Sequence, residues 1–268
     1  MNRTDTMTPL LSARISAEYP GRSPILSGCE IEIGSGEIFA LAGESGSGKS
    51  TFALSLLRLL DGAQARLNGH VHFEGQDLFR LPEREMRRIR GRKISLVPQS
   101  PIESLNPALR IGAQMREAFE VHCSGDWRLA SLRALGDVRL PACDDFLRCY
   151  PRQLSVGMAQ RVLIAMAILH RPPLVIADES TSALDVITQA EVLELLRRLQ
   201  AKFGMSILFI THDLLAAARI CHRIAVLHQG RIVESGSVRE VFERPRHPYT
   251  QSLVAALPVL PWSESVLR

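Results

Sequence analysis

The 268-residue sequence predicts an α/β fold with a parallel sheet covered by helices. Short apolar segments alternate with helical patterns in the second half of the chain, and a glycine-rich loop beginning at position 43 separates a strand from a helix. Residues 110–148 show helical patterns without a convincing strand. We expect one domain over residues 1–268, with an N-terminal antiparallel β subdomain, a helical subdomain inserted at 100–160 and a short helical C-terminal extension at 236–268.

The first half of the chain should contribute short strands and two helices. Apolar, β-rich runs favour strands, and good helix formers with helical apolar spacing favour helices. The helix after the glycine-rich loop should end before Asp61-Gly62, and Asn106-Pro107 breaks the pattern after the last strand. The expected strands cover residues 31–33, 37–42, 70–73 and 94–97, and the expected helices cover residues 50–60 and 82–90.

Regular alternation of strands and helices resumes after the helical region. Fully apolar strands of this kind are typical of a parallel sheet that is buried on both faces. The last two strands flank His228-Gln229-Gly230 and should form a hairpin. The expected helices cover residues 160–169 and 188–202, and the expected strands cover residues 173–177, 206–211, 223–227 and 231–234.

Composition narrows the class of protein. The longest strongly apolar run, residues 162–169, is far shorter than the roughly 20 residues of a membrane-spanning helix. The polar N-terminus lacks the apolar core of a secretory signal, so we expect a cytoplasmic location. Five scattered cysteines without C-x-x-C spacing suggest neither a disulfide framework nor a metal site. The net charge of +4 suits an anionic partner, but the arginine-rich stretch 84–93 lacks aromatic residues that stack on bases, so we expect no nucleic acid.

The glycine-rich loop, Gly43-Glu44-Ser45-Gly46-Ser47-Gly48-Lys49-Ser50, matches the pattern G-x-x-x-x-G-K-S at a strand-to-helix junction. Its glycines let backbone amides turn toward one point, and the following helix directs its positive end to the same place. Lys49 adds a charge for the β- and γ-phosphates, and the Ser50 hydroxyl can bind magnesium. An accidental glycine-rich turn does not account for the full motif, so we assign this loop and Thr51 to nucleotide binding.

An acidic pair, Asp178 and Glu179, follows the apolar run 174–177. A carboxylate at the carboxyl end of a buried parallel strand lies where ligands bind in such sheets. Asp178 would hold Mg²⁺ through water, and Glu179 would orient or deprotonate an attacking water. Alone, such a pair is as often a solvated strand end. Beside the phosphate loop it predicts a site for ATP and Mg²⁺.

Two further polar residues follow expected strands. His212 comes after residues 206–211, and its position after the acidic pair favours a catalytic contact with the γ-phosphate over a purely structural role. Gln99 follows residues 94–97 and opens the helical region. Although most loop glutamines merely face solvent, this position suggests a hinge that contacts both magnesium and nucleotide.

In their order and spacing, these motifs resemble the nucleotide-binding domain of an ABC transporter. The resemblance implies a P-loop NTPase (RecA-like) core. It rests on a Walker A motif at Gly43, a Q-loop at Gln99, the signature Leu154-Ser155-Val156-Gly157-Met158, a Walker B motif at Asp178, a D-loop Ser182-Ala183-Leu184-Asp185 and an H-loop at His212.

A narrower resemblance is to the ATPases of oligopeptide, dipeptide and nickel importers. It rests on Ile89-Arg90-Gly91, on Pro98-Gln99-Ser100-Pro101 with Leu105-Asn106-Pro107, on Ser155-Val156-Gly157-Met158 and on His247-Pro248-Tyr249-Thr250. The family implies ATP hydrolysis coupled to movement of a solute. A non-transport ABC ATPase, such as a partner of a phosphonate-cleaving complex, is the alternative.

The resemblance also implies partners. Two ATP-binding subunits, identical or paralogous, would face each other head to tail, with Ser155, Gly157 and Asp185 of one subunit serving the nucleotide held by the other. Tyr19 matches the position at which the family stacks an aromatic ring on adenine, the alternative being a core or surface tyrosine. The helical region with Gln99 would contact transmembrane permease subunits at the cytoplasmic face of the membrane, and these would receive solute from a binding protein.

Three residues depart from the family pattern. Val156 replaces a glycine, Ala159 replaces a polar or basic residue, and Ser180 replaces the proline that usually follows the catalytic glutamate. Valine is penalised at positive φ, so either position 156 has an ordinary backbone or the signature donates poorly to phosphate. We favour the ordinary backbone because Ser155 and Gly157 are retained. At Ser180 we expect a minor loss of loop stiffness.

Overall fold

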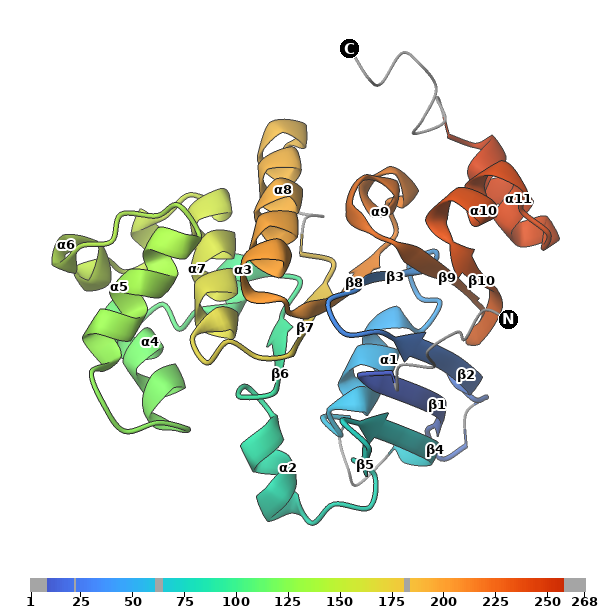
Figure 1. Ribbon diagram of the computed structural model, residues 1–268, viewed down its shortest axis with the longest axis horizontal. Helices are drawn as coiled ribbons and strands as arrows, with labels where there is room; N and C mark the ends of the chain where they lie inside the picture. Colours follow the sequence, from blue (N-terminus) through green and yellow to red (C-terminus); the bar gives the residue numbers. More distant parts are fainter. Residues whose placement is uncertain (1–8, 22, 61–64, 181–183, 258–268) are drawn as a thin grey trace, which may run out of the picture. The chain divides into compact units, whose positions relative to one another are not determined.

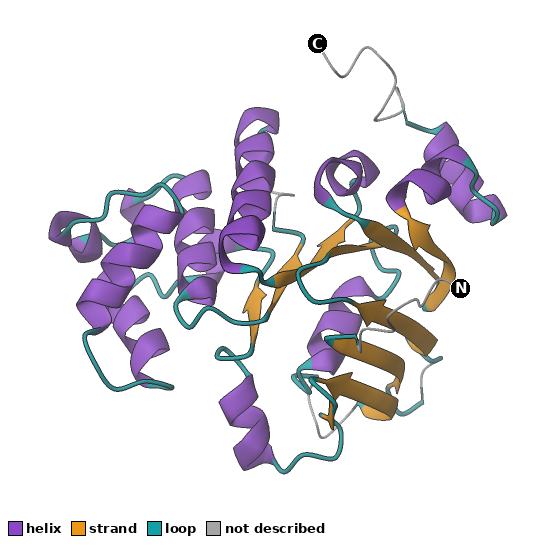
Figure 2. Ribbon diagram, viewed as in Figure 1, coloured by secondary structure: helices purple, strands orange, loops and turns teal. Residues whose placement is uncertain are grey.

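The computed structural model describes residues 9–257, except residue 22, residues 61–64 and residues 181–183. The chain divides into two compact units. The first unit comprises Met1–Glu83 and His212–Arg268, and the second unit comprises Arg84–Thr211. Figure 1 labels their helices and strands, and Figure 2 shows that both units mix the two kinds of element.

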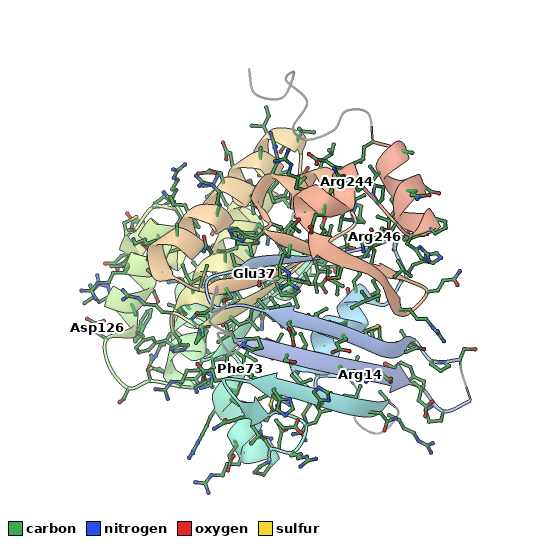
Figure 3. The ribbon with its side chains drawn as sticks, turned by 45° about the vertical axis from the view of Figure 1, so that its right-hand side comes forward. Arg14, Glu37, Phe73, Asp126, Arg244 and Arg246 are labelled. Atoms are coloured by element: carbon green, nitrogen blue, oxygen red, sulfur yellow. The ribbon has the colours of Figure 1, made fainter. Side chains whose placement is uncertain are left out.

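The first unit contains the antiparallel sheet expected near the N-terminus. Its strand order is β2-β1-β4-β5, and every neighbouring pair is antiparallel. Along β1 every second residue is buried, because side chains of a strand alternate between its two faces. Helix α1 packs against β1, and Figure 3 labels Arg14 of β1 and Phe73 of β4. The elements are β1 (Leu11–Glu18), β2 (Leu26–Ile33), β4 (Arg66–Phe73), β5 (Gln76–Asp77) and α1 (Lys49–Leu56).

A second group of strands in the first unit carries the C-terminal helices. Strand β3 (Ile38–Ala42) pairs in parallel with β9 (Arg223–His228), which forms the expected hairpin with β10 (Arg231–Ser237). Apolar side chains of β3 and β9 form one core with the helices that follow β8 and β10. These helices are α9 (Leu214–Ile220), α10 (Val238–Glu243) and α11 (Pro248–Ala255).

The second unit contains three parallel strands in the order β8-β7-β6. They are β6 (Ile94–Val97), β7 (Leu174–Asp178) and β8 (Ser206–Thr211). All residues of β7 and β8 are buried, which explains the apolar runs Leu174–Ala177 and Ile207–Ile210 that form most of these strands. The register pairs Asp178 with Ile210, so the two strands end side by side. With the antiparallel sheet of the first unit, this arrangement matches the expected fold class.

The described residues between β6 and β7 form only helices and turns. Helix α4 packs against α5 and α6, and α7 packs against α5 and β6. None of the helices in the described part of the chain is both long and apolar enough to span a membrane. The helices of this unit are α2 (Glu83–Ile89), α3 (Pro101–Ser104), α4 (Ile111–Glu120), α5 (Trp127–Asp137), α6 (Asp144–Arg148), the 3₁₀ helix η1 (Pro151–Gln153), α7 (Val156–Ile168) and α8 (Val186–Phe203).

Several boundaries differ from those expected from the sequence. Helices α7 and α8 begin earlier than expected, because the side chains of Ser155 and Asp185 cap their first turns and outweigh the modest helix propensity of valine. Strand β1 and helix α9 were missed as individual elements. The period-two alternation of β1 was present in the sequence, and Asp213 caps α9.

Candidate functional site

The glycine-rich loop joins β3 to α1 in the first unit, as the sequence predicts. The Lys49 side chain is buried, and its Nζ donates to the carbonyl oxygens of Gly43 and Glu44, each at 2.9 Å. The ammonium group is therefore held at the start of the loop by the loop's own backbone. A cation in this position supplies the positive charge that phosphate oxygens require.

Backbone geometry explains why two of the loop glycines are required. Gly48 is the N-cap of α1 with φ of 108°, a left-handed conformation that favours glycine, and no side chain caps the helix. At Gly43, a Cβ atom would lie 2.2 Å from the carbonyl oxygen of Leu227. Only glycine allows the loop to pass this close to the end of β9.

The polar atoms of the loop can donate hydrogen bonds to a phosphate group. Among the described residues, the buried Ser47 Oγ has no hydrogen-bond partner. A buried hydroxyl without a partner is costly, and an acceptor oxygen from a ligand would satisfy it. This hydroxyl, the Lys49 ammonium and the N-terminus of α1 form a donor set suited to an anion.

Tyr19 lies directly after β1 and is partly buried. The register pairs Ala17 with Leu26, and Leu26 contacts the backbone at Gly48, where an added Cβ would be only 2.9 Å from Leu26 Cδ2. The sheet thus brings the end of β1 to the same edge as the phosphate loop. His212, also assigned to the first unit, is exposed directly after β8 and precedes Asp213, whose side chain caps α9.

The acidic pair lies at the end of β7 in the second unit. Asp178 is the last strand residue and is only 8% exposed. Glu179 has φ of 42°, which is uncommon for a residue other than glycine, and its N–H donates to Ile210 O at 2.9 Å. The neighbouring strand therefore holds Glu179 in a strained backbone conformation, a feature often found at functional sites.

Gln99 and Glu179 lie far apart in the sequence but meet in the second unit. Gln99 Nε2 donates to Glu179 Oε2 at 2.9 Å. Gln99 follows β6 and Glu179 follows β7, and these two strands are parallel neighbours. Because parallel strands end at the same edge of a sheet, two predicted site residues are brought into direct contact.

The signature motif forms the first turn of α7. Ser155 is its N-cap, and Ser155 Oγ accepts from Met158 N at 3.2 Å. A Cβ at Gly157 would lie 2.7 Å from Thr188 Cγ2 of α8, so glycine allows the two helices to approach closely.

Asp185 lies beside the signature. Its carboxylate accepts from Thr188 Oγ1 at 2.7 Å and from the Ile187 and Thr188 N–H groups, and the Thr188 hydroxyl lowers the pKa of Asp185. Ser155, Gly157 and Asp185 line a common open cavity of about 460 Å³. The predicted Ser182 and Ala183 lie outside the described residues.

Val156 is the first residue of α7 and is not among the described residues with positive φ. A β-branched side chain is therefore accommodated without backbone strain. This supports the interpretation that position 156 has an ordinary backbone. Ser180, the other departure near the site, is buried with 2% exposure.

Sequence reasoning does not predict the contact between α11 and the phosphate loop. Glu44 N donates to Tyr249 Oη at 3.2 Å across 205 positions. In the sequence, HPYT at residues 247–250 indicates only a family resemblance. No local pattern could have indicated this contact, because it depends on how α11 packs in the first unit.

Comparisons with known proteins agree with this geometry. Residues 26–182 match the family model described as ABC transporter, and residues 233–266 match one described as the C-terminal region of oligopeptide/dipeptide transporters. The chain is 46% identical over 226 residues to the dipeptide transport ATP-binding protein DppD of Escherichia coli (strain K12), covering 83% of this chain and 69% of the relative. It is 42% identical over 246 residues to the oligopeptide transport ATP-binding protein OppD of Bacillus subtilis (strain 168), covering 90% and 69%.

Solved structures show the same similarity. A dimeric post-hydrolysis structure of the ATP-binding cassette MJ0796, bound to ADP and Pi, is 27% identical with a TM-score of 0.73, covering 85% of this chain and 99% of that chain. A bacterial Atm1-family ABC exporter with ATP bound is 26% identical with a TM-score of 0.75, covering 94% of this chain and 43% of that one.

Proposed function

Because the chain belongs to the ABC transporter family, we propose that it is the ATP-binding and ATP-hydrolysing subunit of an importer for peptides. The phosphate loop carries this proposal: a buried lysine, a buried hydroxyl without a described partner and a helix N-terminus form its anion site. The C-terminal match and the peptide-transport relatives favour a peptide importer over the non-transport alternative and over nickel import.

Different residues of the chain have different roles in binding and hydrolysing ATP. Residues Gly43 to Thr51 bind the phosphates of ATP, and Tyr19 stacks on the adenine ring. Glu179 orients the attacking water or removes its proton, and Gln99 fixes the direction of the Glu179 carboxylate. His212 contacts the γ-phosphate.

Magnesium is the proposed cofactor. Gln99 and Asp178 of the second unit would offer it amide and carboxylate oxygens, and Ser50 of the phosphate loop would offer a hydroxyl, all hard ligands of the kind that Mg²⁺ prefers. Since Gln99 Nε2 donates to Glu179, the Gln99 amide oxygen is the atom available for the metal. When bound, the ion supplies charge neutralisation on the phosphates.

A second ATP-binding subunit is the proposed partner at the signature surface. Three apolar side chains are exposed near the open cavity: Val156 at 40%, Val186 at 79% and Ile187 at 75%. Exposed apolar groups beside polar donors are typical of a protein interface. Separate permease subunits contact the helical region between residues 100 and 160 and hold the protein at the cytoplasmic face of the membrane. An external solute-binding protein delivers the peptide to these permease subunits and is therefore only an indirect partner.

The Glu179→Gln substitution tests the proposed reaction in protein assembled with its membrane partners. ATP hydrolysis should fall by roughly 100-fold or more, because the carboxylate that activates water is lost. Binding of ATP should remain close to that of the wild type and trap a dimer. Glu194→Gln is the matched control, since Glu194 pairs with Arg197 on the exposed side of α8. If the Glu179→Gln variant hydrolysed ATP at the wild-type rate, the role assigned to Glu179 would be excluded.

A further inference from the structure

Tyr249 joins the C-terminal part of the first unit to the phosphate loop. Its hydroxyl oxygen accepts from Glu44 N at 3.2 Å, and its ring stacks on His228 with centroids 3.7 Å apart and planes 27° apart. Burial, and to a smaller extent the nearby Glu44 carboxylate, raise the pKa of Tyr249 further above neutral pH, where the hydroxyl of an ordinary tyrosine is already protonated. The side chain is thus fixed by two different contacts.

The neighbours of Tyr249 explain how helix α11 presents it. His247 is the N-cap of α11, and its Nδ1 accepts from Tyr249 N at 3.2 Å. Pro248 occupies the first helical position, where its missing N–H has no cost. Thr250 is buried at 1% exposure. His247 and Pro248 therefore fix the first turn of α11, from which Tyr249 projects, and the buried Thr250 anchors that turn in the first unit.

The connection that precedes α11 is also fixed. Glu234 of β10 accepts from Arg246 N at 2.8 Å and from His247 N at 3.0 Å. Figure 3 labels Arg246 in this connection. Because β10 is hydrogen-bonded to β9, the start of α11 is tied to the hairpin that carries His228.

The hairpin itself makes a second contact with the phosphate loop. Gly230 N donates to Ser47 O at 3.1 Å, and Gly43 lies against Leu227 O. The loop is therefore held at Ser47 by the hairpin and at Glu44 by Tyr249. Between these two points lie Ser45 and Gly46, both exposed.

We propose that Tyr249 is a positioning residue for the phosphate loop. Its hydroxyl holds the Glu44 N–H and sets the loop in its binding conformation before nucleotide arrives. A preorganised loop costs less to order on binding, so this contact increases nucleotide affinity. The inference rests on the proposed function for the ligand, and it assigns a role to the C-terminal HPYT sequence.

The Tyr249→Phe variant tests the contact because it removes the hydroxyl and keeps the stacked ring. In nucleotide-free protein, amide hydrogen exchange in peptides covering residues 43–48 should become roughly 3- to 10-fold faster, as expected from losing one hydrogen bond. The dissociation constant for ADP, measured by calorimetry, should rise by a similar factor. Exchange in peptides covering β7 should not change.

Tyr150→Phe is the matched control, because it removes a tyrosine hydroxyl in the second unit, where Tyr150 Oη accepts a long bond from Arg110 Nε at 3.4 Å. It should leave both loop exchange and ADP affinity unchanged. The proposal is overturned if Tyr249→Phe behaves like this control, or if loop exchange and ADP affinity do not change together. Absence of ADP binding by the wild-type protein would instead contradict the proposed function, since the exchange experiment uses no nucleotide.

A double variant tests whether Tyr249 acts through Glu44. The described residues with positive φ do not include Glu44, so Glu44→Pro can remove the N–H donor without reversing the sign of φ. If the two residues act together, Tyr249→Phe should have no further effect on ADP affinity in the Glu44→Pro background. Additive losses would show that the hydroxyl acts elsewhere.

Discussion

Gly157 lies where the signature turn of α7 approaches α8, and it gives a prediction for one residue. Gly157→Ala should lower the thermal unfolding midpoint, because the new Cβ would lie 2.7 Å from Thr188 Cγ2. The expected cost is about 1–3 kcal/mol, as for other overpacked sites. The Thr188 side chain cannot rotate away easily, since its hydroxyl donates to Asp185.

Thr188→Ser in the Gly157→Ala background provides the control. Serine lacks Cγ2 but keeps the hydroxyl, so most of the lost stability should return. Calorimetry of nucleotide-free protein measures both variants. If Thr188→Ser restores nothing, the cost of Gly157→Ala has another origin.

The sequence places Gly157 and Thr188 near helix starts, but it does not determine the backbone conformation of the site residues. At position 156 the sequence favours an ordinary backbone over a poorly donating signature, and the helical start of α7 shows that backbone directly. The positive φ of Glu179 was also not predictable, because it depends on the hydrogen bond from its N–H to Ile210 in β8.

The connection between β10 and α11 gives a prediction about elements. Burial opposes ionisation of Glu234, but N–H groups of Arg246 and His247 donate to its carboxylate, and the net effect lowers its pKa below 4.5. Glu234→Gln should therefore destabilise the protein at pH 7 by about 1 kcal/mol, after allowance for partial exposure. Trypsin cleavage after Arg246 should become faster.

The pH dependence of that effect follows from linkage. A carboxyl group with a lowered pKa in the folded state contributes its full stability above the unfolded-state pKa and loses it as the pH falls through the folded-state pKa. The difference in unfolding midpoint between wild type and Glu234→Gln should thus shrink below about pH 4.5. Glu243→Gln, an exposed control paired with Arg239, should show no such difference. A constant difference down to pH 3.5 would contradict the assignment.

Elements with strong local signals were the most predictable. Strands β7 and β8 each contain a run of four apolar residues, and the observed bounds agree with those expected to within one residue. Helix starts were less predictable, because Ser155 and Asp185 belong to functional motifs and also serve as N-caps of α7 and α8. Their side chains accept hydrogen bonds from backbone N–H groups in the first turn of each helix.

At the scale of the whole molecule, the exposed apolar start of α8 predicts a subunit interface. Ile187→Glu should prevent the ATP-dependent dimer that the Glu179→Gln variant forms, because a charge would replace a side chain that is 75% exposed in the single chain. The unfolding midpoint should change little, as is usual at exposed positions. Light scattering during size-exclusion chromatography measures the dimer.

Val121→Glu is the matched control for the interface. Val121 is 69% exposed at the end of α4, and it does not line the cavity that contains the signature. This variant should still dimerise with ATP. A stable dimer of the Ile187→Glu variant would show that the subunits meet elsewhere.

The sequence by itself determined the fold class, the phosphate loop and the candidate residues at the strand ends. These features depend on local periodicity, on glycine and on the chemistry of neighbouring residues, all of which a linear pattern retains. Only the tertiary structure decided that Gln99 contacts Glu179, that position 156 begins a helix without strain, and that Tyr249 reaches the phosphate loop. The physical reason is that these contacts join segments distant in sequence, and their geometry is set by strand register and helix packing.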